Sequence, residues 1–128
     1  MIINTPISLG ELLDKISILQ IKKSNIKDNE KLKLIIEELT LLEKKLHDVF
    51  SDNINIKEYV DKFFIINSKL WAIEDHIRDC EKQKKFDQKF IELARSIYFT
   101  NDERSKLKLE INQKFGSKIV EVKSYSNY

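Results

Sequence analysis

The longest uninterrupted helical pattern in the chain, residues 56–85, constrains the fold more than any other feature of the sequence. It contains neither glycine nor proline, and as one helix it would measure roughly 45 Å. Apolar residues recur along it at spacings of three and four: Phe63, Ile66, Leu70, Ile73, Ile77 and Cys80. A second, mostly polar stripe lies beside the first: Asn67, Trp71, Glu74, Arg78 and Glu81. Such a helix can face a core with one stripe and a polar site with the other.

The length and charge of the chain limit what it can be. Its 128 residues fit one domain, residues 1–128, that can bury roughly two-thirds of its unfolded surface. No run approaches the ~18 apolar residues of a membrane span, and the N-terminus does not resemble a signal peptide. The 23 basic and 21 acidic residues nearly balance, which leaves no basic footprint for nucleic acid. We expect a soluble cytoplasmic protein with no nucleic-acid partner and no membrane span.

The histidines and the single cysteine do not suggest a metal site. Cys80 alone excludes an internal disulfide, and it continues the apolar stripe, which favours a core position. Glu43 with His47 and His76 with Cys80 are each spaced four apart, but the two pairs would lie on the order of 20 Å apart. Glycine-rich phosphate loops and H-E-x-x-H motifs are absent. We expect no metal and no cofactor, and the sequence assigns no catalytic residue and no reaction.

Two helices are predicted before the long one. Ser8 and Glu11 form an S-x-x-E capping box at the start of the first, which runs from about Leu9 to Ile26. The second runs from about Glu30 to Phe50 and carries a heptad seam of Leu32, Ile35, Leu39, Leu42, Leu46 and Val49. The connection between them is short, so they should be antiparallel neighbours.

The second and third helices are predicted to form a long antiparallel hairpin around a turn at 51–55. Asn55 with Glu58 offers a cap for the third helix. A further turn at 84–87 leads to a fourth helix that begins near Gln88.

The fourth helix has polar residues in the middle of its inward stripe. Thr100 with Glu103 forms a T-x-x-E capping box, so a stop and restart of the helix at Thr100 stays open. Gly116 is a natural C-cap. The tail at 119–125 has strand-like composition but is too short to form a sheet alone, and we expect it to pack on the bundle or pair with a second subunit. The sequence therefore predicts an all-α, antiparallel bundle of about four long helices with a short extended C-terminal tail.

The heights of residues on the third and fourth helices indicate a candidate site. Antiparallel helices joined near Lys85 share a height where residue numbers sum to about 171. Arg104 should then lie level with Asn67, and Arg95 level with Asp75. The polar stripes of the two helices coincide in height, and if their faces match they bring together ten candidate ligand-binding residues: Asn67, Trp71, Glu74, Asp75, Arg78, Arg95, Tyr98, Asn101, Asp102 and Arg104.

This polar layer has two interpretations. All three arginines of the chain belong to it, among twenty lysines elsewhere, and each guanidinium can make a two-pronged contact with a phosphate or carboxylate. The layer would then bind a small anionic ligand. Alternatively it is a structural ion-pair network, with Glu74 and Arg95 as an example, in a non-catalytic interaction or oligomerisation module. The Trp71 ring is consistent with either alternative, as a wall of the ligand site or as a packing residue.

Four segments together resemble a bacterial family of unknown function. They are P-I-S-L-G-E-L-L-D-K-I-S-I-L at 6–19, L-W-A-I-E-D-H-I-R at 70–78, L-A-R-S-I-Y-F-T-N-D-E-R at 93–104 and G-S-K-I-V-E-V-K-S-Y at 116–125. The resemblance covers nearly the whole chain, and Leu9 departs from it where the family commonly has Pro.

The resemblance implies no assigned activity. Relatives that accompany sugar-transfer and surface-polysaccharide proteins would point to phosphorylated or sugar-linked ligands. The family motifs also single out particular positions: Glu11, Asp14, Lys15, Glu74, Asp75, Arg78, Arg95, Tyr98, Asn101, Asp102 and Arg104.

Overall fold

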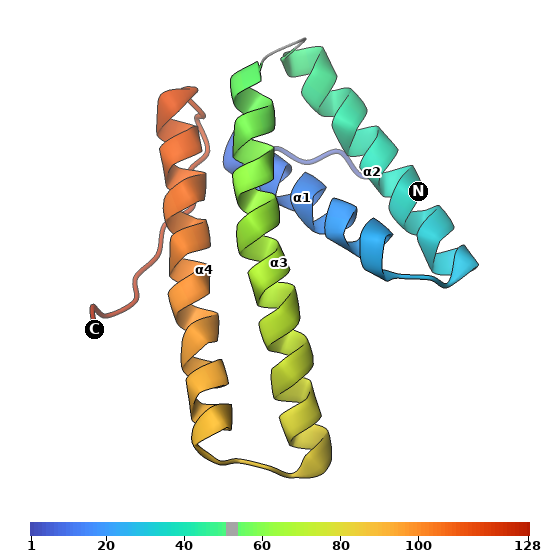
Figure 1. The fold of residues 1–128 in the computed structure, drawn as a ribbon. Helices are drawn as coiled ribbons and strands as arrows, with labels where there is room; N and C mark the ends of the chain where they lie inside the picture. The colour runs from blue at the N-terminus through green and yellow to red at the C-terminus, as the bar shows by residue number, and fades with distance from the viewer. Residues whose placement is uncertain (51–53) are drawn as a thin grey trace.

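A computed structural model describes residues 1–50 and 54–128 and confirms the all-α fold class. Its four helices hold 17, 21, 30 and 27 residues: α1 Leu9–Asn25, α2 Asn29–Val49, α3 Ile54–Gln83 and α4 Gln88–Lys114 (Figure 1). The described residues contain no β-strand. None of their helices combines the length and apolarity needed to cross a bilayer.

The helix starts follow the side chains that cap them. Ser8 Oγ accepts a hydrogen bond from the Glu11 backbone N–H at 3.1 Å, as the capping box predicts. At the start of α2, the Asp28 carboxylate accepts from the Lys31 backbone N–H, and at the start of α4 the Asp87 carboxylate accepts from the Phe90 backbone N–H. The predicted cap at Asn55 is wrong, because α3 already begins at Ile54 and Asn55 lies inside the helix. The rest of the predicted turn, residues 51–53, lies outside the described residues.

The fourth helix does not break at Thr100. This side chain is 1 % exposed and lies in the interior of α4, so the second capping box is not used. The helix ends where glycine allows it. Gly116 has a φ of 67°, and the Ser117 N–H donates to the Asn112 carbonyl at 2.8 Å, which is the Schellman closure.

Helix α1 lies at the centre of the molecule. It contacts α2, α3 and α4, and its buried residues cover far more than one stripe: Gly10, Leu12, Leu13, Asp14, Ile16, Ser17, Leu19 and Ile21. The core that it shares with α3 and α4 is almost inaccessible to solvent: Leu13, Phe63 and Ile111 are each 0 % exposed. The N-terminal helix therefore organises the packing of the other three.

The predicted hairpin of the second and third helices is wrong. In the described residues, the backbone contacts of α2 are with α1, and α2 diverges from α3 (Figure 1). Leu39, 5 % exposed, is the one described residue of α2 that is fully buried, and it packs into the core cluster beside partly buried Ile35, Leu42 and Leu46. The heptad seam is buried or half-buried from Leu32 to Leu46, whereas Val49 is 59 % exposed. Helix α1 and not α3 lies along it, because the short 26–28 connection folds α2 back onto α1 first.

Helices α3 and α4 pack along each other and extend beyond α1 to their connecting turn (Figure 1). Leu70, Ile73 and Cys80 are buried on α3 in this extension, so the predicted core position of Cys80 is confirmed. The chain after α4 runs in an extended conformation back along the same helix.

Replacing Gly10 with alanine should destabilise the fold, although alanine is the better helix former. A Cβ at Gly10 would lie 2.8 Å from the Lys108 carbonyl oxygen and 3.0 Å from the Lys108 Cα, so the α1 and α4 backbones would have to separate. We expect Gly10→Ala to lower the free energy of unfolding by about 1–3 kcal/mol in urea denaturation, as overpacking does.

Gly116→Ala is the comparison that separates backbone strain from a steric clash. A Cβ there meets nothing within 4 Å, so any loss of stability comes from the left-handed backbone alone. A Gly10→Ala chain more stable than wild type would show that α1 and α4 do not approach this closely in solution.

Candidate functional site

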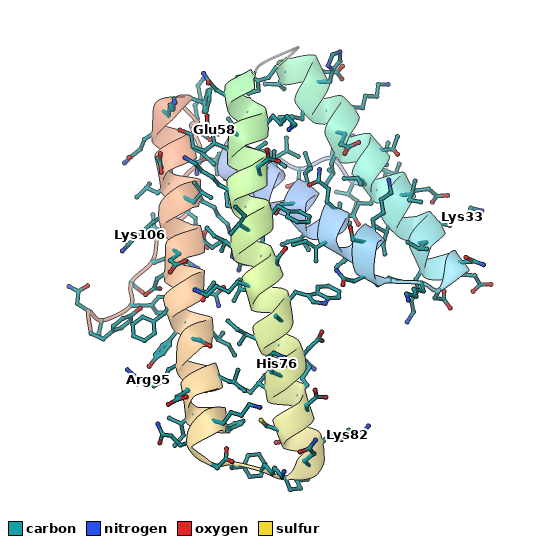
Figure 2. The ribbon with its side chains drawn as sticks, in the orientation of Figure 1. Lys33, Glu58, His76, Lys82, Arg95 and Lys106 are labelled. Carbon is teal, nitrogen blue, oxygen red and sulfur yellow. The ribbon has the colours of Figure 1, made fainter. Side chains whose placement is uncertain are left out.

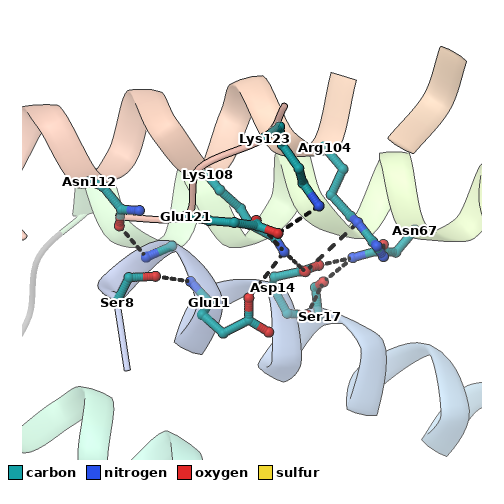
Figure 3. A network of polar contacts seen from close by, with 11 residues as sticks. Ser8, Glu11, Asp14, Ser17, Asn67, Arg104, Lys108, Asn112, Glu121 and Lys123 are labelled. Carbon is teal, nitrogen blue, oxygen red and sulfur yellow. Dashed lines mark hydrogen bonds and ion pairs between the residues drawn. The ribbon is translucent and has the colours of Figure 1, made fainter. Parts of the chain in front are cut away.

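Polar side chains from three helices and the tail meet beside the core (Figure 3). We call this group the interhelical network, and it comprises Glu11, Asp14 and Ser17 of α1, Asn67 of α3, Arg104, Lys108 and Asn112 of α4, and Glu121 and Lys123 of the tail. Two of the ten residues predicted from the sequence, Asn67 and Arg104, belong to it.

Asp14 is the fixed centre of the network. Its side chain is 3 % exposed, and its Oδ1 accepts a hydrogen bond from Asn67 Nδ2 at 2.7 Å. The same Nδ2 donates to Ser17 Oγ at 2.7 Å. Arg104 Nη1 donates to Asn67 Oδ1 at 3.3 Å, and Arg104 Nε lies 3.9 Å from Asp14 Oδ2. Asn67 and Arg104 thus share a height as the residue numbers predicted, and α1 supplies the carboxylate that joins them.

Lys108 places a positive charge in this interior. Its side chain is 9 % exposed, and its Nζ lies 3.0 Å from Glu11 Oε2, 3.2 Å from Asp14 Oδ2 and 3.4 Å from Glu121 Oε2. Burial alone would lower the pKa of the ammonium, but the Asp14 and Glu11 carboxylates outweigh it, and the pKa of Lys108 is raised above 10.5. Lys108 is therefore charged at neutral pH.

Opposite charges balance across the network. Three carboxylates, Glu11, Asp14 and Glu121, face the three cations Arg104, Lys108 and Lys123. Lys123 Nζ lies 2.7 Å from Glu121 Oε1, and this hydrogen bond, with the charge of Lys108, holds the pKa of Glu121 below 4.5. A balanced and hydrogen-bonded group of this kind can fix the register of three helices.

Asn112 contributes a donor that the described residues leave unused. The Gly10 N–H donates to Asn112 Oδ1 at 2.8 Å, which ties the start of α1 to α4. The side chain is 1 % exposed, yet its Nδ2 has no hydrogen-bond partner. Buried donors are nearly always paired, so an unpaired one needs an explanation.

Asn112 lines a pocket between α4 and the tail, which we call the tail pocket. It has a volume of about 260 Å³. Its wall consists of Ser105, Lys106, Lys108, Leu109, Asn112, Glu121 and Lys123. Three lysines and one glutamate thus line the same space as Asn112. Among residues 1–50 and 54–128, no cluster of three or more His, Cys, Asp or Glu is arranged to hold a metal ion.

The other predicted site residues do not converge with Asn67 and Arg104. Glu74 pairs with Arg78 on its own helix at 3.3 Å, with side chains 46 % and 78 % exposed. Arg95 is exposed on the side of α4 away from α3 (Figure 2), and its guanidinium lies 5.8 Å from the centroid of the Phe99 ring. Asp75 is also exposed, and Trp71 and Asn101 are half-buried.

Tyr98 and Asp102 lie where the end of the tail contacts α4. The Tyr128 ring packs on Tyr98 and Phe99, with centroids 5.5 Å and 5.0 Å away. Its hydroxyl donates to the Asp102 carboxylate, a hydrogen bond that raises the pKa of Tyr128 to about 12. The tail therefore touches α4 at two separate places, at Glu121 and at Tyr128.

Sequence reasoning from helix heights missed Lys108, Asn112, Glu121 and Lys123. Lys108 is one of twenty lysines, and nothing in its type marks it as buried. A signal was present in its neighbours, because Lys108 and Asn112 adjoin the buried apolar residues Leu107 and Ile111. Glu11 was singled out by the capping box and the family motifs, and Asp14 by the family motifs alone; helix heights pointed to neither.

Comparison with known proteins adds a family and no activity. The model of a family of unknown function, DUF6165, matches residues 3–128. No curated protein and no solved structure matches the chain.

Lys108→Met should destabilise the protein strongly. It would leave the Asp14 carboxylate, 3 % exposed, with Arg104 at 3.9 Å as its nearest cation. Removing one partner of a buried ion pair costs about 3–5 kcal/mol, and we expect that loss in urea denaturation. Lys106→Met, at an exposed neighbour on the same helix, should change stability by less than about 0.5 kcal/mol. Equal effects of the two changes would show that Asp14 and Lys108 do not form a buried pair.

Acidification should loosen the tail. The Glu121 carboxylate has a pKa below its ordinary value of 4.5, so its contacts with Lys108 and Lys123 stabilise the folded tail above pH 4.5. That stabilisation is lost as the pH falls through the lower folded-state pKa. An NMR titration of the Glu121 side-chain carboxyl should give a midpoint below 4.5, and a midpoint at or above 4.5 would mean that the two lysines do not hold it in solution.

Proposed function

Since the chain belongs to this family of unknown function, we propose from its own geometry that it binds a small carboxylate- or phosphate-bearing anion in the tail pocket. The observation that carries the proposal is the buried side chain of Asn112, a residue of the pocket wall whose Nδ2 donor has no hydrogen-bond partner. An anion oxygen is a strong acceptor for such a group, and charge-assisted hydrogen bonds are about twice as strong as neutral ones.

The charges of the wall support an anion over other ligands. Lys106, Lys108 and Lys123 against Glu121 give the lining a formal charge of +2. Within the whole network the charges of Arg104, Lys108 and Lys123 are already balanced, so Lys106 is the cation in excess beside the pocket. A single bound anion would balance the charge of Lys106 and would also accept a hydrogen bond from the Asn112 amide.

The size of the pocket limits the ligand. A volume of about 260 Å³ is below the roughly 300–1,000 Å³ typical of drug-sized ligands. A phosphate, a small carboxylic acid or the phosphate end of a sugar phosphate is of the right size. The proposal is one of binding and assigns no reaction.

Asn67 and Arg104 have a positioning role in this proposal. They hold the Asp14 carboxylate, which in turn holds Lys108 against the pocket. The exposure of Arg78 and Arg95 gives less support to an anion site at their height on α3 and α4, because solvent competes for an exposed guanidinium.

A second candidate function is the interaction module, and exposed apolar side chains favour it. Leu34 and Leu41 lie one heptad apart on α2 and are 66 % and 51 % exposed. Phe86 and Ile91, near the turn between α3 and α4, are 54 % and 47 % exposed. Exposed apolar side chains that gather into a patch are common where a partner binds.

Asn112→Asp is the sharpest test of the anion proposal. The variant keeps the Oδ1 acceptor for the Gly10 N–H and replaces the unpaired donor with a negatively charged oxygen. Wild type should bind inorganic phosphate in isothermal titration calorimetry, and Asn112→Asp should bind at least about tenfold more weakly.

Gln113→Glu provides the matched control. It makes the same change of charge at an exposed neighbour that does not line the pocket, and it should leave phosphate binding nearly unchanged. Absence of phosphate and small-carboxylate binding by wild type would refute the anion proposal, favour a water molecule at Asn112 and leave the interaction module as the remaining candidate.

A further inference from the structure

The C-terminal tail is held by few contacts. It leaves α4 through the left-handed turn at Gly116 and runs back along the helix (Figure 1). All of residues 118–128 are exposed, with Val122 at 86 % and Tyr125 at 75 %. Segments with little buried surface and exposed backbone open at low free energy. Two of its residues attach this tail to α4, Glu121 through its carboxylate and Tyr128 through its ring and its hydroxyl.

Glu121 already supplies the tail pocket with an anion. Its Oε2 lies 3.4 Å from Lys108 Nζ, and its Oε1 lies 2.7 Å from Lys123 Nζ (Figure 3). Both lysines line the pocket, as Glu121 itself does. A carboxylate between two ammonium groups is the arrangement that a bound phosphate or carboxylate would also make.

The three carboxylates around Lys108 differ in how firmly they are held. Glu11 and Asp14 belong to α1, which is packed into the core, and they lie 3.0 Å and 3.2 Å from the ammonium. Glu121 is as exposed as Glu11, 37 % against 36 %, but it lies farthest, at 3.4 Å, and belongs to a segment without regular secondary structure. If one of the three gives way to another anion, Glu121 does so at the lowest cost.

We infer that the C-terminal tail is a latch on the tail pocket, in which Glu121 of the pocket wall holds the Lys108 ammonium until an anion bound in the pocket takes its place at that ammonium. The inference rests on the proposed function and adds its regulation. Displacement removes one of the two attachments of the tail. The remaining one, Tyr128 on Tyr98, Phe99 and Asp102, lies at the surface and opens with it, so anion binding uncovers these two aromatic rings of α4.

Glu121→Gln tests the competition directly. The amide has the shape of the carboxylate but no charge, so it binds the ammonium groups of Lys108 and Lys123 more weakly. Titration calorimetry with inorganic phosphate should give an affinity for Glu121→Gln about tenfold above wild type, the effect of one charge-assisted hydrogen bond. Glu103→Gln makes the same change of charge at an exposed position of α4 outside the pocket and should alter the affinity less than about twofold.

NMR of the full chain tests the opening. Without phosphate, the ring protons of Tyr128 should show nuclear Overhauser effects to those of Tyr98 and Phe99. At saturating phosphate these signals should disappear, and in Glu121→Gln they should already be weakened without phosphate.

The outcomes separate the latch from the binding function. If neither wild type nor Glu121→Gln binds phosphate, the tail pocket is not an anion site and both proposals fail. If wild type binds and Glu121→Gln binds equally or more weakly, the binding function stands, but Glu121 is not a competitor and the latch is refuted. Persistence of the Tyr128 contacts at saturating phosphate also refutes the latch.

Discussion

The burial of the Lys108 ammonium beside the Asp14 carboxylate is the interaction on which the arrangement of α1, α3 and α4 depends. Neither charge could remain there alone, since an unpaired ion in the interior costs several kcal/mol. Their separation of 3.2 Å therefore fixes where α1 crosses α4. Asn67 extends the constraint to α3 through its bond to Asp14, and Gly10 allows the close approach of the two backbones. Apolar burial stabilises this bundle, while the polar contacts determine its register.

The sequence predicted the helices well and their neighbours poorly. Periodicity and caps such as Ser8 and Gly116 are local, and they located four helices to within a few residues. Which helix covers the heptad seam of α2 is a non-local question, because the sequences of α1 and α3 both carry an apolar stripe that could cover it. The question left open at Thr100 has the same origin. A capping box is a local signal, and the buried position of Thr100 in a continuous helix overrides it.

The candidate site was predictable only in part. Counting residues around a turn correctly set Asn67 level with Arg104, since helix rise is constant. It could not give the rotation of each helix about its axis, so Arg95 turned out to face solvent. The carboxylates that meet Lys108 come from α1 and from the tail, and no spacing in the sequence relates those segments to α4. Rotation and long-range pairing are set by tertiary packing.

The contact of Gly10 with Asn112 also has a consequence for how the protein is made. These residues are 102 positions apart, and Lys108 and Glu11 are separated by 97. During synthesis, α1 and α2 leave the ribosome well before the residues of α4 that cover α1. The buried side of α1, including Leu13 and Ile16, therefore stays incompletely covered until α3 and α4 have been made. The contacts of α1 with α4 can form only after most of the bundle has been synthesised.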